Sequence, residues 1–172
     1  MSLETEPFTV NVDPEVSDEE LASLLHTVYV EGGHTPALVA ETLLAPDHVR
    51  ARGSLITAED NRTGELLGMI VVVPPAGAAR QVARHGEAEF HLLGVHPSAR
   101  GKGIGRALVR RALKFAKSQG WYQIVLSTQK QMTTAQAIYT AAGFQRVPER
   151  DWVRSDRQFF VYAIEVLTAK RA

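Results

Sequence analysis

Residues 93–105 read LGVHPSARGKGIG, and three of the last five are glycines, at positions 101, 103 and 105. The residues just before, Glu87 to Val95, alternate in character and predict a strand. After the glycines, apolar residues recur at helical spacing as far as Gly120, which predicts a helix. The order strand, glycine-rich turn, helix is typical of a phosphate site, because free backbone N–H groups and the positive end of the helix dipole meet there.

Two common phosphate-binding turns do not match this stretch. A Walker loop requires Gly-Lys-Ser/Thr after a four-residue spacer, and that arrangement is absent. A dinucleotide fingerprint requires a small residue where the chain has Arg106, and an acidic residue at the end of the next strand, where Ser127 stands. Taken alone, the three glycines are equally typical of an ordinary tight turn.

The segment RGKGIG at 100–105, following LGVHP at 93–97, resembles the acetyl-CoA signature of the GCN5-related N-acetyltransferases, the GNAT superfamily. A second segment, AQAIYTAAGF at 135–144, is similar to the later motif of that family and lies at about the right distance downstream. The close resemblance covers residues 87–144, which it identifies as a coenzyme-binding core. One departure is Met132, because the family usually carries an asparagine at this position.

The resemblance implies a single α/β domain over residues 1–172. Its expected fold is a mixed, mostly antiparallel central sheet of six to seven strands, flanked by about four helices and splayed between the fourth and fifth strands. The first eighty residues agree with the family in the order of their elements. Residues 1–3 are interpreted as a cloning remnant and carry no part of the fold argument.

Acetyl-CoA is the co-substrate that the resemblance implies, with its pyrophosphate on the glycine-rich turn and its pantetheine arm between the splayed strands. The implied contacts are Leu93, Gly94, Val95, Arg100, Gly101, Lys102, Gly103, Ile104, Gly105, Arg106, Thr134, Ala135 and Tyr139. The N–H of Val95 is implied to polarise the thioester carbonyl. A glycine inside a strand usually marks a bulge or a close backbone approach, so we expect Gly94 to lie where strand pairing is disrupted.

The same resemblance assigns proton transfers to a few side chains. Tyr139 is implied to donate a proton to the departing thiolate, although it can also simply pack on Phe144. An acceptor ammonium has a pKa near about 10, so a base is required. Glu87, Glu89 and His91 share one face of the predicted strand and are the candidates. Alternating polar residues are also typical of a solvated strand face, and that alternative stays open.

Other residues are candidates for the acceptor side of the site. Tyr29, Glu31 and His34 lie where the first helices of the family usually wall the acceptor pocket. Trp152 is a candidate to cover the acceptor, with a satellite core position or a dimer contact as the alternatives. The loop 76–86 is rich in small residues and is the expected mobile segment near the site.

Composition excludes several other classes of protein. The 19 basic and 19 acidic residues cancel, so no overall field attracts nucleic acid or an anionic membrane. The longest apolar run, residues 66–73, is too short to cross a bilayer. There is no cysteine, and the six histidines lack zinc-site spacing, so no metal is predicted. We expect a cytoplasmic protein, with a homodimer as an open alternative.

The function expected from the sequence is therefore an N-acetyltransferase. It would transfer an acetyl group from acetyl-CoA to a primary amine of a small molecule or peptide, by direct attack in a ternary complex. The alternative is a catalytically weak acyl-CoA-binding regulatory module, which Met132 in place of asparagine favours. The identity of the acceptor amine stays open, because fold analogy does not extend to the acceptor half of the site.

Overall fold

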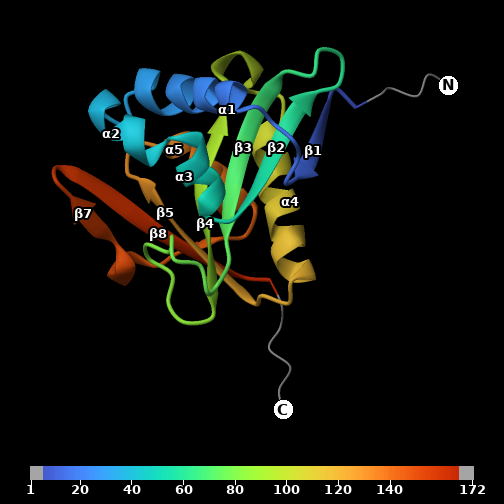
Figure 1. The fold of residues 1–172 in the computed structure, drawn as a ribbon. Coiled ribbons are helices and arrows are strands. Elements are labelled where there is room, and N and C mark those ends of the chain that lie inside the picture. Colours follow the sequence, from blue (N-terminus) through green and yellow to red (C-terminus); the bar gives the residue numbers. More distant parts are fainter. Residues whose placement is uncertain (1–5, 167–172) are drawn as a thin grey trace.

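The computed structural model describes residues 6–166, which form an open sheet with helices on both faces (Figure 1). The strands are β1 (Phe8–Val12), β2 (Ser54–Asp60), β3 (Leu66–Val73), β4 (Glu87–Val95), β5 (Gln123–Gln129), β6 (Gln145–Arg146), β7 (Trp152–Arg154) and β8 (Arg157–Glu165). The α-helices are α1 (Asp18–Leu25), α2 (Ala37–Leu43), α3 (Pro46–Ala51), α4 (Ile104–Ser118) and α5 (Thr133–Ala141). Residues 6–166 also contain three short helical segments: the π-helix η1 (His26–Glu31) and the 3-10 turns η2 (Pro97–Ala99) and η3 (Pro148–Arg150).

The predicted α/β fold class is confirmed, and the element counts exceed the prediction slightly. The sheet contains eight strands because the short strands β6 and β7 both pair with β8. The helix α3 begins at Pro46, separated from the end of α2 by two residues, and is one helix more than the four expected. Within residues 6–166, no helix is both long and apolar enough to cross a membrane. The proposed remnant at residues 1–3 lies outside the described residues.

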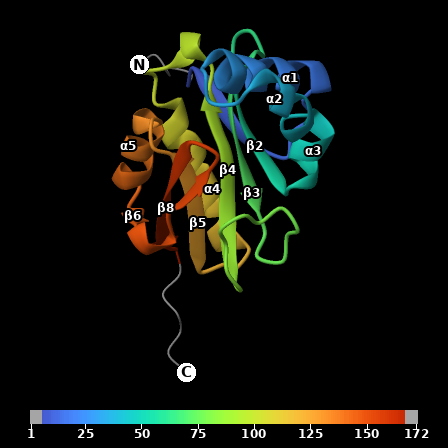
Figure 2. The ribbon, with the colours of Figure 1, turned by 90° about the vertical axis from the view of Figure 1, so that its left-hand side faces the viewer.

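The strand order is β1-β2-β3-β4-β5-β8-β6, with β7 also on β8. Among the strands of residues 6–166, only the β4–β5 pair is parallel. These two strands pair from Glu87 opposite Gln123 to Phe90 opposite Leu126, and no further pairing between them follows (Figure 2). The predicted splay between the fourth and fifth strands is therefore confirmed.

A β-bulge in β4 lies beside the splay. Leu92 has a left-handed φ of 54°, and the register with β3 shifts between Met69 and Val71. The extra residue reverses the alternation of the strand, so Leu93 packs in the core beneath α4 and not on the face of Glu89. The strand face that Glu87, Glu89 and His91 were predicted to share therefore ends before Leu93.

The bulge is at Leu92, whereas Gly94 lies beyond the last β4–β5 pair, which confirms the expectation that Gly94 lies where strand pairing is disrupted. Its role is the close approach that glycine also permits: a Cβ added there would lie 3.2 Å from Val28 Cγ1 and 3.5 Å from Tyr29 Cε2. The π-helix η1 thus lies directly against the backbone of β4. Any larger residue at position 94 would force η1 away from the strand.

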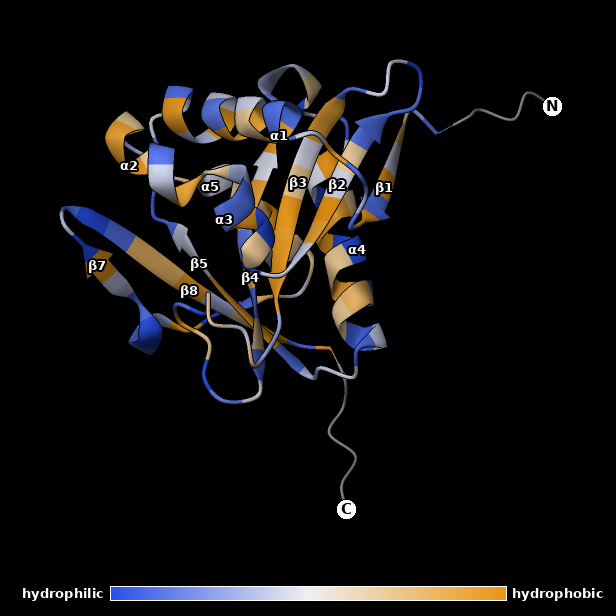
Figure 3. Cartoon of the chain, in the orientation of Figure 1, coloured by the Kyte–Doolittle hydropathy of each residue, from blue (hydrophilic) through white to orange (hydrophobic). Residues whose placement is uncertain are grey.

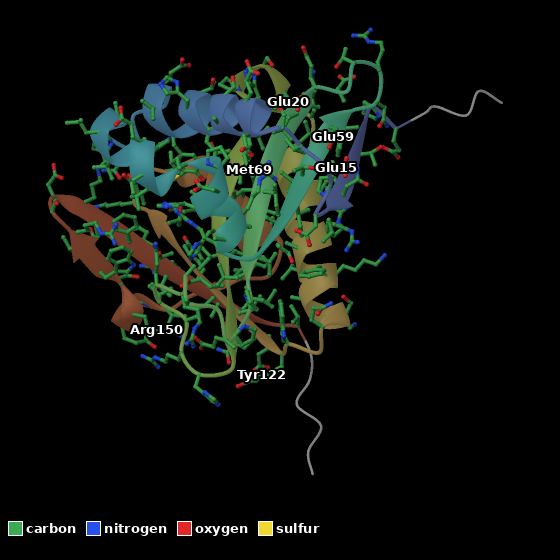
Figure 4. The ribbon with its side chains drawn as sticks, in the orientation of Figure 1. Glu15, Glu20, Glu59, Met69, Tyr122 and Arg150 are labelled. Atoms are coloured by element: carbon green, nitrogen blue, oxygen red, sulfur yellow. The ribbon has the colours of Figure 1, made fainter. Side chains whose placement is uncertain are left out.

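Two hydrophobic cores lie on opposite faces of the sheet, and β3 belongs to both. Met69, Val71 and Val73 face α1, α2 and α3, whereas Ile70 and Val72 face α4 and α5. Figure 3 shows apolar residues along β3, and Met69 is labelled on this strand in Figure 4. Burial on both faces explains the continuous apolar run of this strand.

Two S/T-x-x-E/Q patterns in the sequence predict capping boxes, Ser17 with Glu20 and Thr133 with Gln136, and these two predictions have different outcomes. The capping box of Ser17 and Glu20 at the start of α1 is confirmed. The capping box expected for Thr133 and Gln136 is wrong, because Met132 is the N-cap residue of α5 and provides no side-chain cap. Gln136 Nε2 instead donates to the carbonyls of Gln129 and Lys130, each at 3.0 Å.

A buried ion pair joins η3 to the start of β4. The guanidinium of Arg150 binds the carboxylate of Glu87 through two contacts of 3.0 and 2.9 Å. The two side chains are only 8% and 7% exposed. Arg150 also donates to the carbonyl of Val82, which lies in the loop 76–86. Figure 4 labels Arg150 beside that loop.

We expect Arg150→Met to lower the free energy of unfolding by about 3–5 kcal/mol, because it leaves the Glu87 carboxylate buried without its partner. The double variant Arg150→Met/Glu87→Met removes both charges and should recover most of that loss. Urea denaturation at neutral pH measures both variants. A single variant that unfolds at the same urea concentration as the unmodified chain would contradict this expectation.

Candidate functional site

Two connected cavities open where β4 and β5 separate. The turn cavity, about 380 Å³, lies between the end of β4, the glycine-rich turn and the start of α5. The splay cavity, about 520 Å³, lies between β4, β5, α2 and the β7–β8 hairpin. The two share the lining residues His34, Leu93, Met132 and Ala135.

The residues predicted to contact a coenzyme gather in the turn cavity. All of them line it except Lys102, which is exposed on the turn, and Tyr139, which lines the splay cavity. The turn and the start of α5 are about thirty residues apart in the sequence. They meet because a Cβ at Gly105 would lie only 2.7 Å from Ile138 Cδ1, so α4 and α5 pack in close contact there.

The glycine-rich turn has the geometry of an anion cradle. Gly101 and Gly103 have left-handed φ values of 78° and 80°, and a Cβ added to either would meet nothing within 4 Å. In residues 6–166, no protein acceptor is hydrogen-bonded to the amides of 101–106. The first turn of α4 carries no acidic residue. This open row of N–H groups at a helix start can bind phosphate oxygens.

Backbone groups of β4 are exposed to the gap beyond the last β4–β5 pair. The N–H of His96 donates to the carbonyl of Leu67 on the β3 side, at 2.8 Å. Because successive amides of a strand point to opposite edges, the N–H of Val95 points toward the gap. On the same strand, the carbonyl of Leu93 accepts a 2.9 Å hydrogen bond from the Tyr29 hydroxyl.

Tyr139 packs against aromatic neighbours and also lines a cavity. Its ring makes an edge contact with Phe144 at 5.7 Å between centroids and a tilted contact with Tyr162 at 6.3 Å. It is also among the residues that line the splay cavity. Burial, with a smaller contribution from Tyr29, raises the pKa of the Tyr139 hydroxyl well above its ordinary value. The hydroxyl is therefore uncharged at neutral pH, as in an ordinary tyrosine, and it can donate a hydrogen bond into the cavity.

Glu89 is fully buried and organises the loop before β4. Its carboxylate accepts from the amides of Gln81 and Val82 at 2.6 Å and from that of Ala83 at 3.1 Å. His91 Nε2 lies 2.8 Å away on the same carboxylate. Burial acts to raise the pKa of Glu89, but the hydrogen bonds from His91 and the loop amides outweigh it and hold the pKa below its ordinary value. The loop expected to be mobile is thus tied to the strand.

The three candidate bases do not occupy equivalent positions. Glu87 is engaged by Arg150, and Glu89 by the loop, and neither lines a cavity. His91 lines the splay cavity. Its Nδ1 lies 3.3 Å from Arg52 Nη1. Because a guanidinium only donates, Nδ1 is the acceptor and the N–H is on Nε2, facing Glu89.

Of the four residues predicted for the acceptor side, three lie at one cavity and the fourth does not. Tyr29, His34 and Trp152 line the splay cavity. Glu31 is exposed and lies 3.6 Å from His26, away from both cavities. The ring of Trp152 stacks on Phe159 at 4.1 Å between centroids, and this stack forms one wall.

Sequence reasoning missed several lining residues of the splay cavity, chiefly Arg52 and the hairpin residues Arg154 and Arg157. Arg52 is the C-cap residue of α3, and the two hairpin arginines come from β7 and β8. No local spacing relates these positions. The sequence showed only that arginines stand just before and after predicted strands. That pattern does not indicate a particular site.

Residues 19–144 match the family model described as the Acetyltransferase (GNAT) family. The N-alpha-acetyltransferase RimI of Mycobacterium tuberculosis is 30% identical over 86% of this chain and 84% of its own length. N-acetyltransferase 8F1 of Rattus norvegicus is 30% identical over 62% of this chain, which spans only 46% of that relative. A solved GNAT-family acetyltransferase from Staphylococcus aureus has a TM-score of 0.70 at 16% identity, covering 92% of this chain and all of its own.

A second solved structure, a putative acetyltransferase from Salmonella typhimurium with its cofactor acetyl-CoA, has a TM-score of 0.69 at 18% identity. It covers 96% of this chain and 98% of its own. At these identities, the two solved structures establish likeness of fold.

We expect acid to destabilise the protein through Glu89. Because its pKa is lowered in the native state, its stabilising contribution is complete above its ordinary value of 4.5 and is lost as the pH falls through the native value. The free energy of unfolding should therefore fall less steeply below about pH 4.5 in Glu89→Gln than in the unmodified chain. Glu19→Gln, at an exposed position of α1, is the matched control. Equal slopes for all three proteins in urea titrations would contradict this assignment.

Proposed function

Because this chain belongs to the GNAT acetyltransferase family, we propose that it transfers an acetyl group from acetyl-CoA to a primary amine of a small molecule or peptide. One observation carries the proposal: an anion cradle and a cavity lined by Tyr139 meet at the point where β4 and β5 separate. The acetyl-CoA in the Salmonella protein of like fold supports the choice of donor. The names of the relatives support an amine acceptor.

The turn cavity accounts for binding of the donor in this proposal. The free amides of 101–106 hold the pyrophosphate, and Arg100 and Arg106 add positive charge at its edge. The pantetheine arm then extends between β4 and β5, past Leu93 and Ala135, which line both cavities. The thioester then lies at the junction of the two cavities, close to the amide of Val95, which lines the turn cavity beside Leu93.

The reaction follows from the groups at that point. The amine nitrogen attacks the thioester carbon, a C–N bond forms, and the C–S bond breaks. The N–H of Val95 stabilises the developing oxyanion, a contribution on the order of 3 kcal/mol for one such donor. His91 Nδ1 accepts the proton of the amine through water once Arg52, 3.3 Å away, releases this nitrogen, and the Glu89 carboxylate, 2.8 Å from Nε2, stabilises the resulting positive charge. Tyr139 donates a proton to the departing sulfur.

A coenzyme-binding module without turnover is the competing proposal. Met132 lines both cavities and caps α5 without a polar side-chain contact, so the thioester meets an apolar side chain where the family usually supplies an amide. An enzyme and a binding module bind acetyl-CoA alike. They differ in release of the free thiol when an amine is added.

Thiol release from acetyl-CoA across a panel of amines tests the catalytic part of the proposal. We expect at least one amine to drive release, and Tyr139→Phe to lower kcat by about 100-fold, because the departing thiolate loses its proton donor. Tyr162→Phe is the matched control, since this neighbouring tyrosine lines neither cavity. The chain has no cysteine, so a disulfide reagent reports only the coenzyme thiol. Binding of acetyl-CoA without release by any amine would favour the binding module.

A pair of glycine substitutions tests the anion cradle. Gly103→Ala and Gly64→Ala both place a Cβ at a left-handed φ, 80° and 74°, with nothing within 4 Å. Each should lower the free energy of unfolding by about 1–2 kcal/mol through backbone strain. Only Gly103→Ala should weaken acetyl-CoA binding in calorimetry, because Gly64 lies in the turn between β2 and β3. Equal affinities for the two variants would place the pyrophosphate elsewhere.

A further inference from the structure

Basic side chains predominate in the splay cavity. Arg52, Arg154, Arg157, His34 and His91 line it. In the part of the chain that the structure describes, Asp156 is the only carboxylate in this lining. The whole chain is neutral, so the excess of positive charge is a local property of the cavity. A cavity built only to receive a cationic amine would not be expected to carry this lining, because like charges repel.

Arg52 is the half-buried member of this group with an unbalanced charge. Its Nη2 donates to the carbonyl of Leu43 at 2.7 Å, and its Nη1 lies 3.3 Å from His91 Nδ1. Neither partner carries a negative charge. Between residues 6 and 166, the ion pairs of arginine are those of Arg50, Arg146 and Arg150, and Arg52 is in none of them. Burial lowers the pKa of Arg52, which reflects the cost of holding its charge away from water.

Arg157 adds a second guanidinium at the same cavity. It donates to the carbonyl of His34 and, at 3.3 Å, to Oε1 of Gln129, which are again neutral acceptors. Burial, then the positive charges of Arg100 and Arg157, lower the pKa of His34. His34 lines both cavities, so the positive potential extends across their junction.

The remaining walls of the splay cavity are apolar. Val39 and Leu43 of α2 form one side and are 45% and 37% exposed. The stacked rings of Trp152 and Phe159 form another. An apolar or aromatic group between these walls would cover surface that water now contacts.

We propose, resting on the acetyltransferase function above, that the acceptor is an amino acid with a free carboxylate and an apolar or aromatic side chain, its carboxylate bound by Arg52. A carboxylate matches the planar donor fork of a guanidinium and supplies the charge that Arg52 lacks. Arg157 strengthens the same positive field. With the carboxylate at Arg52, the amine is directed to His91, which lies beside Arg52 in the same cavity. Polyamines and aminoglycosides, which lack a carboxylate, would leave this charge unmatched.

Three acceptors with the same aromatic body test the proposal: phenylalanine, phenylalaninamide and phenethylamine. We expect kcat/KM for phenylalanine to exceed that of the other two by about 10- to 100-fold. Arg52→Gln should reduce this preference to near one, and Arg52→Lys should keep part of it. Arg157→Gln should reduce it by a smaller factor. Arg110→Gln makes the same chemical change on the exposed face of α4 and should keep the full preference.

Binding provides a second readout that does not require turnover. With coenzyme A present, N-acetylphenylalanine should bind more tightly than N-acetylphenethylamine in calorimetry, and Arg52→Gln should remove the difference. If binding shows this dependence on Arg52 while no amine is acetylated, the carboxylate site is supported and the acetyltransferase function is contradicted. The carboxylate site is contradicted if all three amines react at similar rates. It is also contradicted if neither readout depends on Arg52 in variants that keep the native melting temperature.

Discussion

The extra residue at Leu92 is the constraint on which the site depends. By adding one residue to β4, the bulge ends the regular alternation of the strand just after its last pair with β5. The backbone of β4 beyond that point must then find other partners. Leu93 finds one in the Tyr29 hydroxyl, and the amide of Val95 is directed into the gap. Both cavities exist because the strand that walls them stops pairing at this place.

The sequence predicted what local chemistry controls. The glycines at 101 and 103 occupy left-handed positions that other residues rarely adopt, so a phosphate-type turn was readable from their spacing. The capping box at Ser17 was readable because its two members are three residues apart. The bulge could not be predicted from the sequence. A leucine with a left-handed φ carries no sequence signal, and Gly94 was the more obvious candidate for a bulge. The partners of Glu89 and Glu87 were hidden as well, since Glu87 meets Arg150 only through the fold.

The two halves of the site are therefore built in different ways. The turn cavity is made largely from two segments with readable motifs, and their meeting depends on the close contact at Gly105. The splay cavity is assembled from α2, the end of α3, β4, β5 and the β7–β8 hairpin. Its charged residues have no common spacing, so Arg52 and Arg157 could be recognised only from the structure. A chain of neutral overall charge can thus contain one strongly cationic cavity.

The π-helix η1 has a consequence for how this chain tolerates changes in length. Its wider turn places Val28 against Gly94 and the Tyr29 hydroxyl on the carbonyl of Leu93. A π-helix can be regarded as an α-helix with one residue inserted. Deleting one residue before Val28 would restore an ordinary helix and rotate one side of it by about 100° relative to the other. The loss of a single codon in η1 would thus detach Tyr29 from β4, although the same deletion in the exposed turn between β2 and β3 would leave the cavity walls in place.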